Sequence, residues 1–419
     1  MKYYSTNDVA NMSTDNSTNK ISVFESILLT LIFVFFTADS LIFGSNADTF
    51  FVKIKYLFFY STFFYLIIKS KNRIDKNSFF LLLTFIGIIS VSMLINSDLR
   101  LGYIQKMIVI IASYLYCRLY SLKRFAFLYT KIMFFLVGVS LAFEACYLVF
   151  PQLVKLFTLT NVAGISFNTW FIASLPIMPG GVIRNFGFAR EPGVFAIFII
   201  LALLFESFVN EEKSIKRIVV FVIGVLTTIS TSGYIALAIY LIALLIYIEK
   251  FNFNNKNKIR FLLVILVGFI LYLALKTDML FGEQYGSVFG KMYNKGNGAG
   301  GSFNARFASI ISNVYMGFQN ILFGKGITYV DENFSNVSWQ ILQVDVRDNA
   351  NTLFIHLAQY GMLFFSLQWY CLIKTVKNIS ESKVINIFCL LTYLAVAMSQ
   401  TLIASPIFFI MLFLRNEEN

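Results

Sequence analysis

The chain has 419 residues, of which 58% are hydrophobic and only 13% carry a charge, and its mean hydropathy is +0.73. A soluble protein of this length needs far more polar surface, so the composition excludes one and indicates a membrane protein with many spans. The formal net charge of +12 does not indicate nucleic-acid binding, because most lysines and arginines flank apolar runs, as they do in membrane proteins.

Twelve apolar runs are long enough, or nearly so, for a bilayer that needs about 20 residues per helix. In chain order they are residues 24–44, 52–69, 78–96, 102–120, 127–150, 191–209, 216–232, 233–249, 260–280, 351–373, 384–399 and 401–415. We therefore predict an all-α polytopic membrane protein with about 12 transmembrane helices. It would form one integral-membrane domain over residues 24–415, between short tails at 1–23 and 416–419.

The distribution of positive charge gives the orientation of these spans. With the N-terminus in the cytoplasm, every short cytoplasmic segment is basic, and these segments hold 21 of the 34 lysines and arginines. This is the positive-inside pattern, and it places both chain ends in the cytoplasm. Residues 151–190 and 281–350 then become the two long outer segments. Both are too polar to span a membrane and too long for turns, so we expect function there.

The second outer segment contains a predicted amphipathic helix at residues 303–322. Its apolar side chains fall on one helical face, which is typical of a helix lying in the membrane interface. They are Phe303, Phe307, Ile310, Val314 and Phe318, with Ile311 and Leu322 beside them. The preceding GNGAGG at 296–301 is interpreted as a flexible linker rather than a phosphate-binding loop, because no strand precedes it.

The sequence RNFGFAREPG at residues 184–193 is the strongest indication of function. Arg184 and Arg190 lie on the outer side, where positive side chains are normally sparse. Pro192 suits the first turn of the following helix and Glu191 suits its cap. Arginines beside a helix N-terminus are typical of a phosphate site. For any single arginine, a contact with a lipid headgroup or an acidic side chain is the alternative.

Arg306 and Arg347 lie in the second outer segment, and together with Arg184 and Arg190 they favour a diphosphate-binding site. A diphosphate leaves readily when its charge is stabilised, so these cations would replace a metal or a general acid. The four cysteines lie in apolar runs without CxxC spacing, and there is one histidine. We therefore predict no metal, no cofactor and no disulfide framework.

This layout and several short motifs resemble the Wzy-type bacterial O-antigen polymerases, within a wider group that includes O-antigen ligases and exopolysaccharide polymerases. The resemblance covers the whole chain in layout and is specific in RNFGFAREPGVF at 184–195. Two further features carry the resemblance. One is the spacing of Arg306 and Gly317, with ten residues between them, and the other is ILFGKG at 321–326. It implies a GT-C-like, multi-pass protein of the bacterial inner membrane with both termini cytoplasmic.

One motif separates the polymerases from the ligases. The ligases resemble one another in a histidine followed by Asn, Ser or Gln, nine residues and then glycine, at the start of a late span. Here Asn351 is followed by nine residues and Gly361, but Ala350 precedes it. The only histidine, His356, lies five residues further along. This departure favours a polymerase, and a buried intramembrane role is the alternative for His356.

The resemblance implies a glycosyltransferase that moves a growing glycan from undecaprenyl diphosphate to a hydroxyl of another lipid-linked repeat unit. The catalytic candidates are then Arg190, Glu191 and Arg306. The candidates for binding the diphosphate or the glycan are Arg184, Arg347, Asp345, Asp348, Asn351 and His356. Glu191, Asp345 or Asp348 would act as general base, or would instead orient the neighbouring arginines.

The expected partners are the undecaprenyl-diphosphate-linked oligosaccharide, membrane lipid and, by resemblance, a chain-length regulator and a flippase, with no nucleic acid. Two alternatives fit less well: a ligase, which would move the glycan to lipid A-core, and a flippase or other carrier. A carrier would concentrate its cations within spans around a central cavity. Three acidic residues lie within predicted spans, where charge is costly and often functional. They are Asp39, Glu144 and Glu206.

Overall fold

The computed structural model describes most of the chain. The described residues are 21–155, 157–177, 183–248, 260, 264–265, 268, 302–343, 346, 349–402 and 404–415. Outside them lie residues 1–20 and 416–419, most of the predicted span 260–280, the glycine-rich stretch 296–301 and the candidates Asp345, Arg347 and Asp348.

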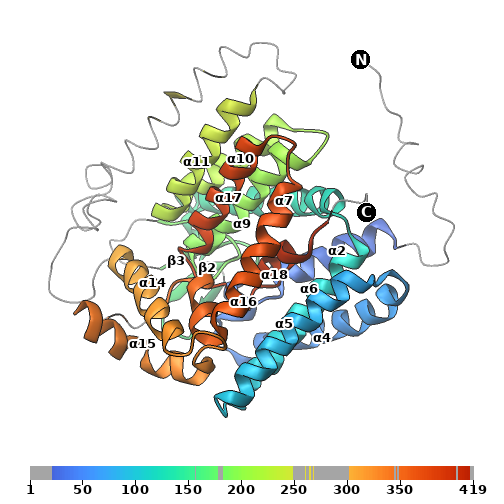
Figure 1. Ribbon diagram of the computed structural model, residues 1–419. Helices are drawn as coiled ribbons and strands as arrows, with labels where there is room; N and C mark the ends of the chain where they lie inside the picture. The colour runs from blue at the N-terminus through green and yellow to red at the C-terminus, as the bar shows by residue number, and fades with distance from the viewer. Residues whose placement is uncertain are drawn as a thin grey trace.

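Helices form most of the described chain (Figure 1). The first group is α2 (Val23–Phe35), α3 (Leu41–Gly44), α4 (Thr49–Ser70), the turn η1 (Lys71–Arg73), α5 (Lys76–Ile95), α6 (Leu101–Leu119), α7 (Leu122–Val149) and α8 (Pro151–Val154). The second is α9 (Pro192–Leu204), its π-helical extension η2 (Phe205–Val209), α10 (Ile215–Thr227) and α11 (Thr231–Tyr247). The third is α14 (Ser302–Gln319), α15 (Gly326–Leu342), α16 (Thr352–Lys377), α17 (Lys383–Ala397) and α18 (Pro406–Phe413).

Four of the described helices are long and apolar enough to cross a membrane. They are Thr49–Ser70, Lys76–Ile95, Leu122–Val149 and Pro192–Val209, and shorter apolar helices accompany them. In Pro192–Val209, 94% of the most apolar stretch is buried inside the protein, against at most 33% in the other three. The helix α9 is therefore central, whereas the other three present apolar side chains outward, as expected of a polytopic membrane protein.

The first predicted span, 24–44, is wrong in its second half. Helix α2 ends at Phe35, because polar residues follow and interrupt the apolar run. The chain beyond it joins the segment 184–193 instead. There the Leu41 N–H donates a hydrogen bond to the carbonyl oxygen of Phe188 at 2.8 Å. This contact places the end of the first predicted span beside the arginine-containing segment.

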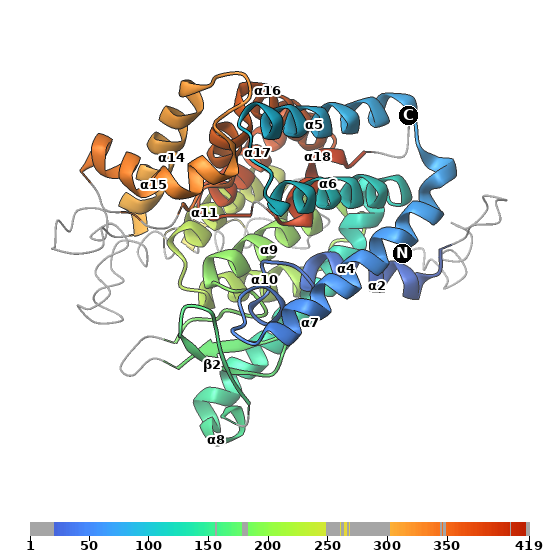
Figure 2. The same cartoon turned by 90° about the horizontal axis from the view of Figure 1, so that it is seen from below.

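The first outer segment contains a small sheet, which corrects the all-α prediction. Strands β1 (Thr158–Thr160), β2 (Ser166–Thr169) and β3 (Ser174–Pro176) are antiparallel, in the order β1-β2-β3. The turn after β1 contains Gly164 at φ +78°, a backbone conformation that favours hairpins. Figure 2 shows β2 and α8 at the end of the molecule opposite α5 and α16.

The second outer segment contains the predicted helix, which is confirmed over Ser302–Gln319. Its exposed side includes Phe307 and Phe318, which are 50% and 58% exposed. Other side chains of this helix are small and polar, and three of them are buried. The buried ones are Ser309, Ser312 and Asn313. An apolar face that points away from the protein is what a helix in the membrane interface requires.

Helix α16 is broken at Gly361, where φ is +79° and ψ is −175°. Only glycine adopts this conformation without strain. The residues 321–326 lie against the break, and the Met362 N–H donates to the carbonyl oxygen of Ile321 at 2.7 Å. A Cβ on Gly361 would lie 2.4 Å from the carbonyl carbon of Leu322. The break therefore packs residues 321–326, in the interior of the second outer segment, against α16.

A cluster of charges around Asp75 joins the C-terminal end of the described chain to the turn between α4 and α5. The Asp75 side chain caps α5 by accepting from the Ser78 N–H at 2.7 Å. Its Oδ2 pairs with Arg118 at 2.5 Å and with Arg415 at 2.6 Å. Burial acts to raise the pKa of Asp75, but hydrogen bonds from Ser78 and the two guanidinium charges outweigh it and lower the pKa to about 2.

We expect Asp75→Asn to lower the free energy of unfolding by about 2 kcal/mol at neutral pH, because it leaves Arg118, whose side chain is 6% exposed, without its carboxylate partner. The folded-state pKa lies below the ordinary value of 3.8. This contribution is therefore present above about pH 4 and is lost as the pH falls toward 2. Thermal unfolding in detergent should show the difference between wild type and variant shrinking on acidification. A constant difference would contradict the assignment, and Glu211→Gln, at an exposed pair with Lys123, is the control.

Candidate anion-binding site

The first half of the segment 184–193 is held by buried polar contacts. The Asn185 N–H donates to the carbonyl oxygen of Thr227 at 3.0 Å, and its Nδ2 donates to Glu144 Oε2 at 3.2 Å. Gly187 then turns the chain at φ +52°, a conformation that favours glycine. Glu144, which the sequence places inside a span, thus positions this segment.

Arg190 is the central cation of the segment. Its backbone N–H donates to the carbonyl oxygen of Asp39 at 2.8 Å. Its guanidinium donates to the carbonyl oxygen of Thr401 at 2.7 Å and to Glu191 Oε1 at 3.2 Å, and its Nε lies 3.9 Å from Asp39 Oδ1. The Asp39 side chain is 4% exposed and that of Arg190 is 25% exposed. Arg190 therefore offers a partly open guanidinium held in place by a buried carboxylate.

Arg306 reaches the same region from α14. Its Nε donates to the carbonyl oxygen of Ser399 at 3.0 Å. Arg184 lies nearby and donates through Nε to the carbonyl oxygen of Thr228 at 3.2 Å. Burial lowers the pKa of Arg306, Glu191 acts to raise it, and Arg184 acts to lower it further. Arg306 is therefore within electrostatic reach of Glu191 and Arg184. Glu191 in turn contacts the guanidinium of Arg190 at 3.2 Å.

The turn 399–402, between α17 and α18, connects these cations to the start of α16. Thr352 Oγ1 donates to the carbonyl oxygen of Gln400 at 2.6 Å. Asn351 Nδ2 donates to the carbonyl oxygen of Met398 at 3.3 Å, and its Oδ1 caps α16 by accepting a backbone N–H at 3.0 Å. The structure thus gives Asn351 a positioning role: it fixes the turn that receives Arg190 and Arg306.

The N-terminus of α9 is built as predicted, with Glu191 at the cap and Pro192 in the first turn. However, the side chain of Gln400 lies over it. A Cβ on Gly193 would approach Gln400 Nε2 to 2.3 Å. An anion arriving here would therefore meet the guanidinium of Arg190 and not the backbone N–H groups of α9.

His356 lies apart from this group, in the interior. It is fully buried, and its Nδ1 forms a hydrogen bond with Gln368 Oε1 at 2.7 Å. Aromatic rings surround it, from Tyr360, Phe364, Phe408 and Phe409. Among the described residues it contacts none of the three arginines, so its surroundings are those of a core histidine.

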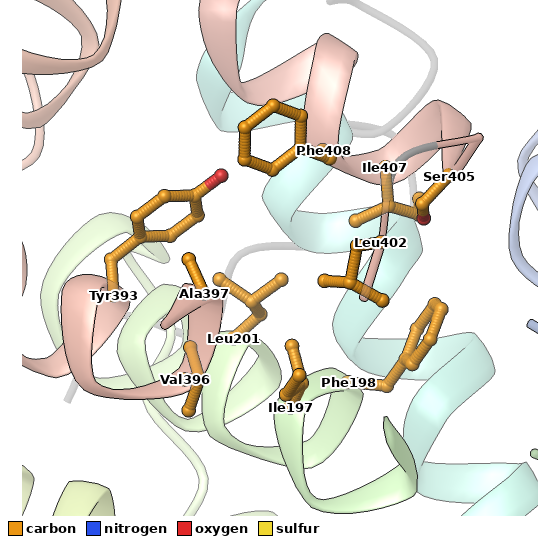
Figure 3. Close-up of a pocket in the computed structure, with 10 residues that line it drawn as sticks. All are labelled: Ile197, Phe198, Leu201, Tyr393, Val396, Ala397, Leu402, Ser405, Ile407 and Phe408. Atoms are coloured by element: carbon orange, nitrogen blue, oxygen red, sulfur yellow. The ribbon is translucent and has the colours of Figure 1, made fainter. Parts of the chain in front are cut away.

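A cavity of about 10 Å³ lies between α9, α17 and α18 (Figure 3). Its walls are mostly apolar, with Phe198, Tyr393 and Phe408 among them. A volume of this size holds about one water molecule. A lipid-linked glycan cannot bind in a cavity of this size.

Two features of this site do not follow from the sequence: the pairing of Asp39 with Arg190 and the turn 399–402. The polar residues Ser399, Gln400 and Thr401 are a visible signal in the sequence. The predicted spans 384–399 and 401–415 leave only Gln400 between them. No family model matches the chain, and no curated protein matches it.

Proposed function

We propose that the protein is a Wzy-type polymerase that joins undecaprenyl-diphosphate-linked repeat units at the periplasmic face of the bacterial inner membrane. The observation that supports this most is the meeting of Arg190 and Arg306 at the turn 399–402. The two side chains come from different outer segments, and Arg184 lies near them. Three guanidinium groups exceed the charge of Asp39 and Glu191, so the site attracts an anion.

In the proposed reaction, an acceptor sugar hydroxyl attacks the anomeric carbon of the glycan linked to undecaprenyl diphosphate. The bond from that carbon to the diphosphate oxygen breaks, and undecaprenyl diphosphate leaves with the bonding electron pair. Arg190 and Arg306 stabilise the charge that develops on the leaving diphosphate. Glu191, whose side chain is 47% exposed beside Arg190, accepts the proton of the acceptor hydroxyl.

Deletion of the gene in a Gram-negative host that makes O-antigen tests this proposal. We expect a lipopolysaccharide gel to show core carrying one repeat unit without a ladder, because transfer to core continues while polymerisation is lost. Bare core would mean that ligation or export has failed. That result would contradict the polymerase and favour a ligase or a flippase.

A further inference from the structure

A polar cleft lies between α14 and α15, separate from the arginine site. Its volume is about 600 Å³, within the range of roughly 300–1,000 Å³ of small-molecule sites. Tyr315 and Gln319 line it from α14, and the remaining wall comes from α15. The two helices are joined across it by the Tyr329 hydroxyl, which donates to Gln319 Oε1 at 3.2 Å. This hydrogen bond holds the two walls of the cleft together within the second outer segment.

Both exposed aromatic rings and amides line the cleft. Trp339 is 53% exposed and Tyr315 is 48% exposed, which leaves ring surface open to a ligand. The amides are those of Gln319, Asn333, Asn336 and Gln340. Each amide both donates and accepts hydrogen bonds. Sugar rings need both partners, because their C–H faces pack on aromatic rings while their hydroxyls donate and accept.

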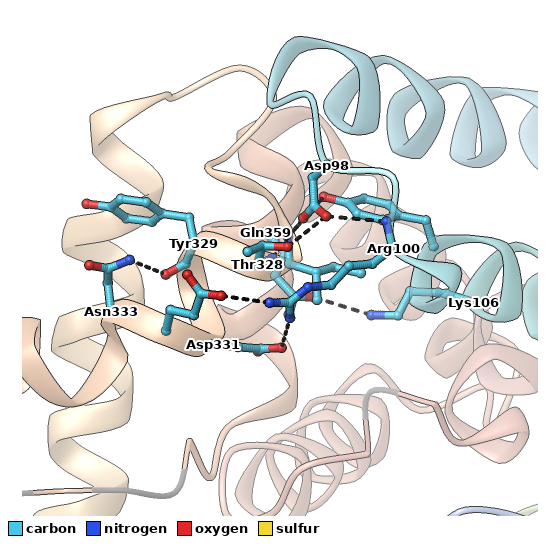
Figure 4. A network of polar contacts seen from close by, with 11 residues as sticks. Asp98, Arg100, Lys106, Thr328, Tyr329, Asp331, Asn333 and Gln359 are labelled. Carbon is cyan, nitrogen blue, oxygen red and sulfur yellow. Dashed lines mark hydrogen bonds and ion pairs between the residues drawn. The ribbon is translucent and has the colours of Figure 1, made fainter.

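The α15 wall is fixed in place by a polar network at its N-terminal end (Figure 4). Asp98 accepts from the Thr328 N–H at 2.8 Å and from its hydroxyl at 2.7 Å. Arg100 pairs with Asp331 at 3.2 Å and with Glu332 at 3.0 Å. These contacts tie α15 to the turn between α5 and α6, so the cleft does not have to be assembled on binding.

The cleft carries no charge of its own. Among the described residues, no Lys, Arg, Asp or Glu lines it. The nearby acidic groups of Asp331 and Glu332 are already paired with Arg100. Lys325 lies outside the lining, with its Nζ 4.6 Å from the centroid of the Tyr329 ring. The described lining itself offers an ionised sugar no counter-charge for the hydration that it loses.

We propose that this cleft binds an uncharged segment of an oligosaccharide. The identity of that oligosaccharide as the lipid-linked glycan rests on the proposed function. Helix α14 connects the two sites, since Tyr315 is nine residues beyond Arg306. At the geometry of an α-helix this is roughly 13 Å along the axis and roughly two and a half turns, so the cleft lies on the face of α14 opposite Arg306. A glycan whose diphosphate lies at Arg306 therefore reaches the cleft with sugars several units further along the chain, and the cleft holds the chain during transfer.

Photo-crosslinking in the native host tests the proposal with the glycan that the host makes. The crosslinker p-benzoylphenylalanine replaces Gln340 in the full-length protein, and in a matched control it replaces Val162, which is 75% exposed in the turn after β1. After irradiation, the protein is purified, and covalently bound sugars are identified by hydrolysis. We expect neutral sugars on the Gln340 variant and at most background on the Val162 variant. Three results would overturn the proposal: equal labelling of the two variants, no sugar on the Gln340 variant, or mainly acidic sugars on it.

A second variant pair separates ligand contact from a folding defect. With purified protein and lipid-linked glycan, Trp339→Ala should raise KM about tenfold with little change in kcat, because an exposed anchoring ring is lost. Trp339→Phe keeps an aromatic face and should restore most of the affinity. An unchanged KM in a folded Trp339→Ala protein would contradict the glycan cleft. A different result is that the deletion mutant keeps its ladder while the Gln340 variant still crosslinks to sugar. That result would support the glycan cleft and contradict the proposed polymerase function.

Discussion

Replacing Arg190 or Arg306 by alanine is expected to abolish long glycan chains while the protein stays in the membrane. Each side chain would stabilise charge on the leaving diphosphate, and removing one such group typically costs about 10²–10³ in rate. A gel of the host's glycan, at matched protein levels, should show short products only. Arg190 also neutralises the buried Asp39, so its alanine variant loses some stability as well. Arg306→Ala therefore gives the cleaner test.

Lysine variants at the same positions distinguish charge from geometry. Arg190→Lys and Arg306→Lys should restore chain length only partly, because an ammonium keeps the charge but loses the planar fork. Arg73→Ala is the matched control, since Arg73 is exposed in the turn η1, away from the three arginines of the site and from the cleft. It should leave the ladder intact. Wild-type glycan length in both alanine variants at normal expression would contradict the diphosphate site.

Gly361→Ala is expected to prevent accumulation of folded protein. The new Cβ would lie 2.4 Å from the Leu322 backbone, at a residue whose φ is +79°. Neither the backbone of residues 321–326 nor the helix break can move aside without losing the hydrogen bonds between them. We therefore expect a loss of more than about 4 kcal/mol, at the severe end of single substitutions. Detergent extraction followed by size-exclusion chromatography would measure the loss.

Gly87→Ala is the matched control for this effect. Gly87 lies within α5, and a Cβ built on it meets nothing within 4 Å. Alanine has the higher helix propensity, by up to about 1 kcal/mol, so the variant should be as stable as the wild type or slightly more so. Folded Gly361→Ala protein with a wild-type melting temperature would show that α16 is not broken in the way described.

Local signals in the sequence predicted the helices well because apolar runs and caps are local features. Pro192 and Glu191 start α9 where the sequence places them. The helix at Ser302–Gln319 likewise follows its apolar periodicity. Short strands such as β1 (Thr158–Thr160) were not predicted, because three or four residues show no readable alternation.

The site was predicted only in part, because its partners are distant in sequence. Arg190 and Arg306 were chosen for their charge on the outer side. Their meeting at Thr401 and Ser399 depends on how α17 and α18 turn beside the start of α16. Asp39 was assigned to a span because a hydropathy window averages one carboxylate with its apolar neighbours. Such contacts follow from tertiary packing, which no local pattern encodes.

Reconstitution of the purified protein tests the central claim most directly. The protein in lipid vesicles would receive one synthetic undecaprenyl-diphosphate-linked repeat unit, with neither lipid A-core nor any other enzyme. The account predicts a ladder of lipid-linked glycans and one undecaprenyl diphosphate released for each unit added, with both lost in Arg306→Ala. Movement of the unit across the bilayer without lengthening, or transfer that occurs only once lipid A-core is added, would contradict it.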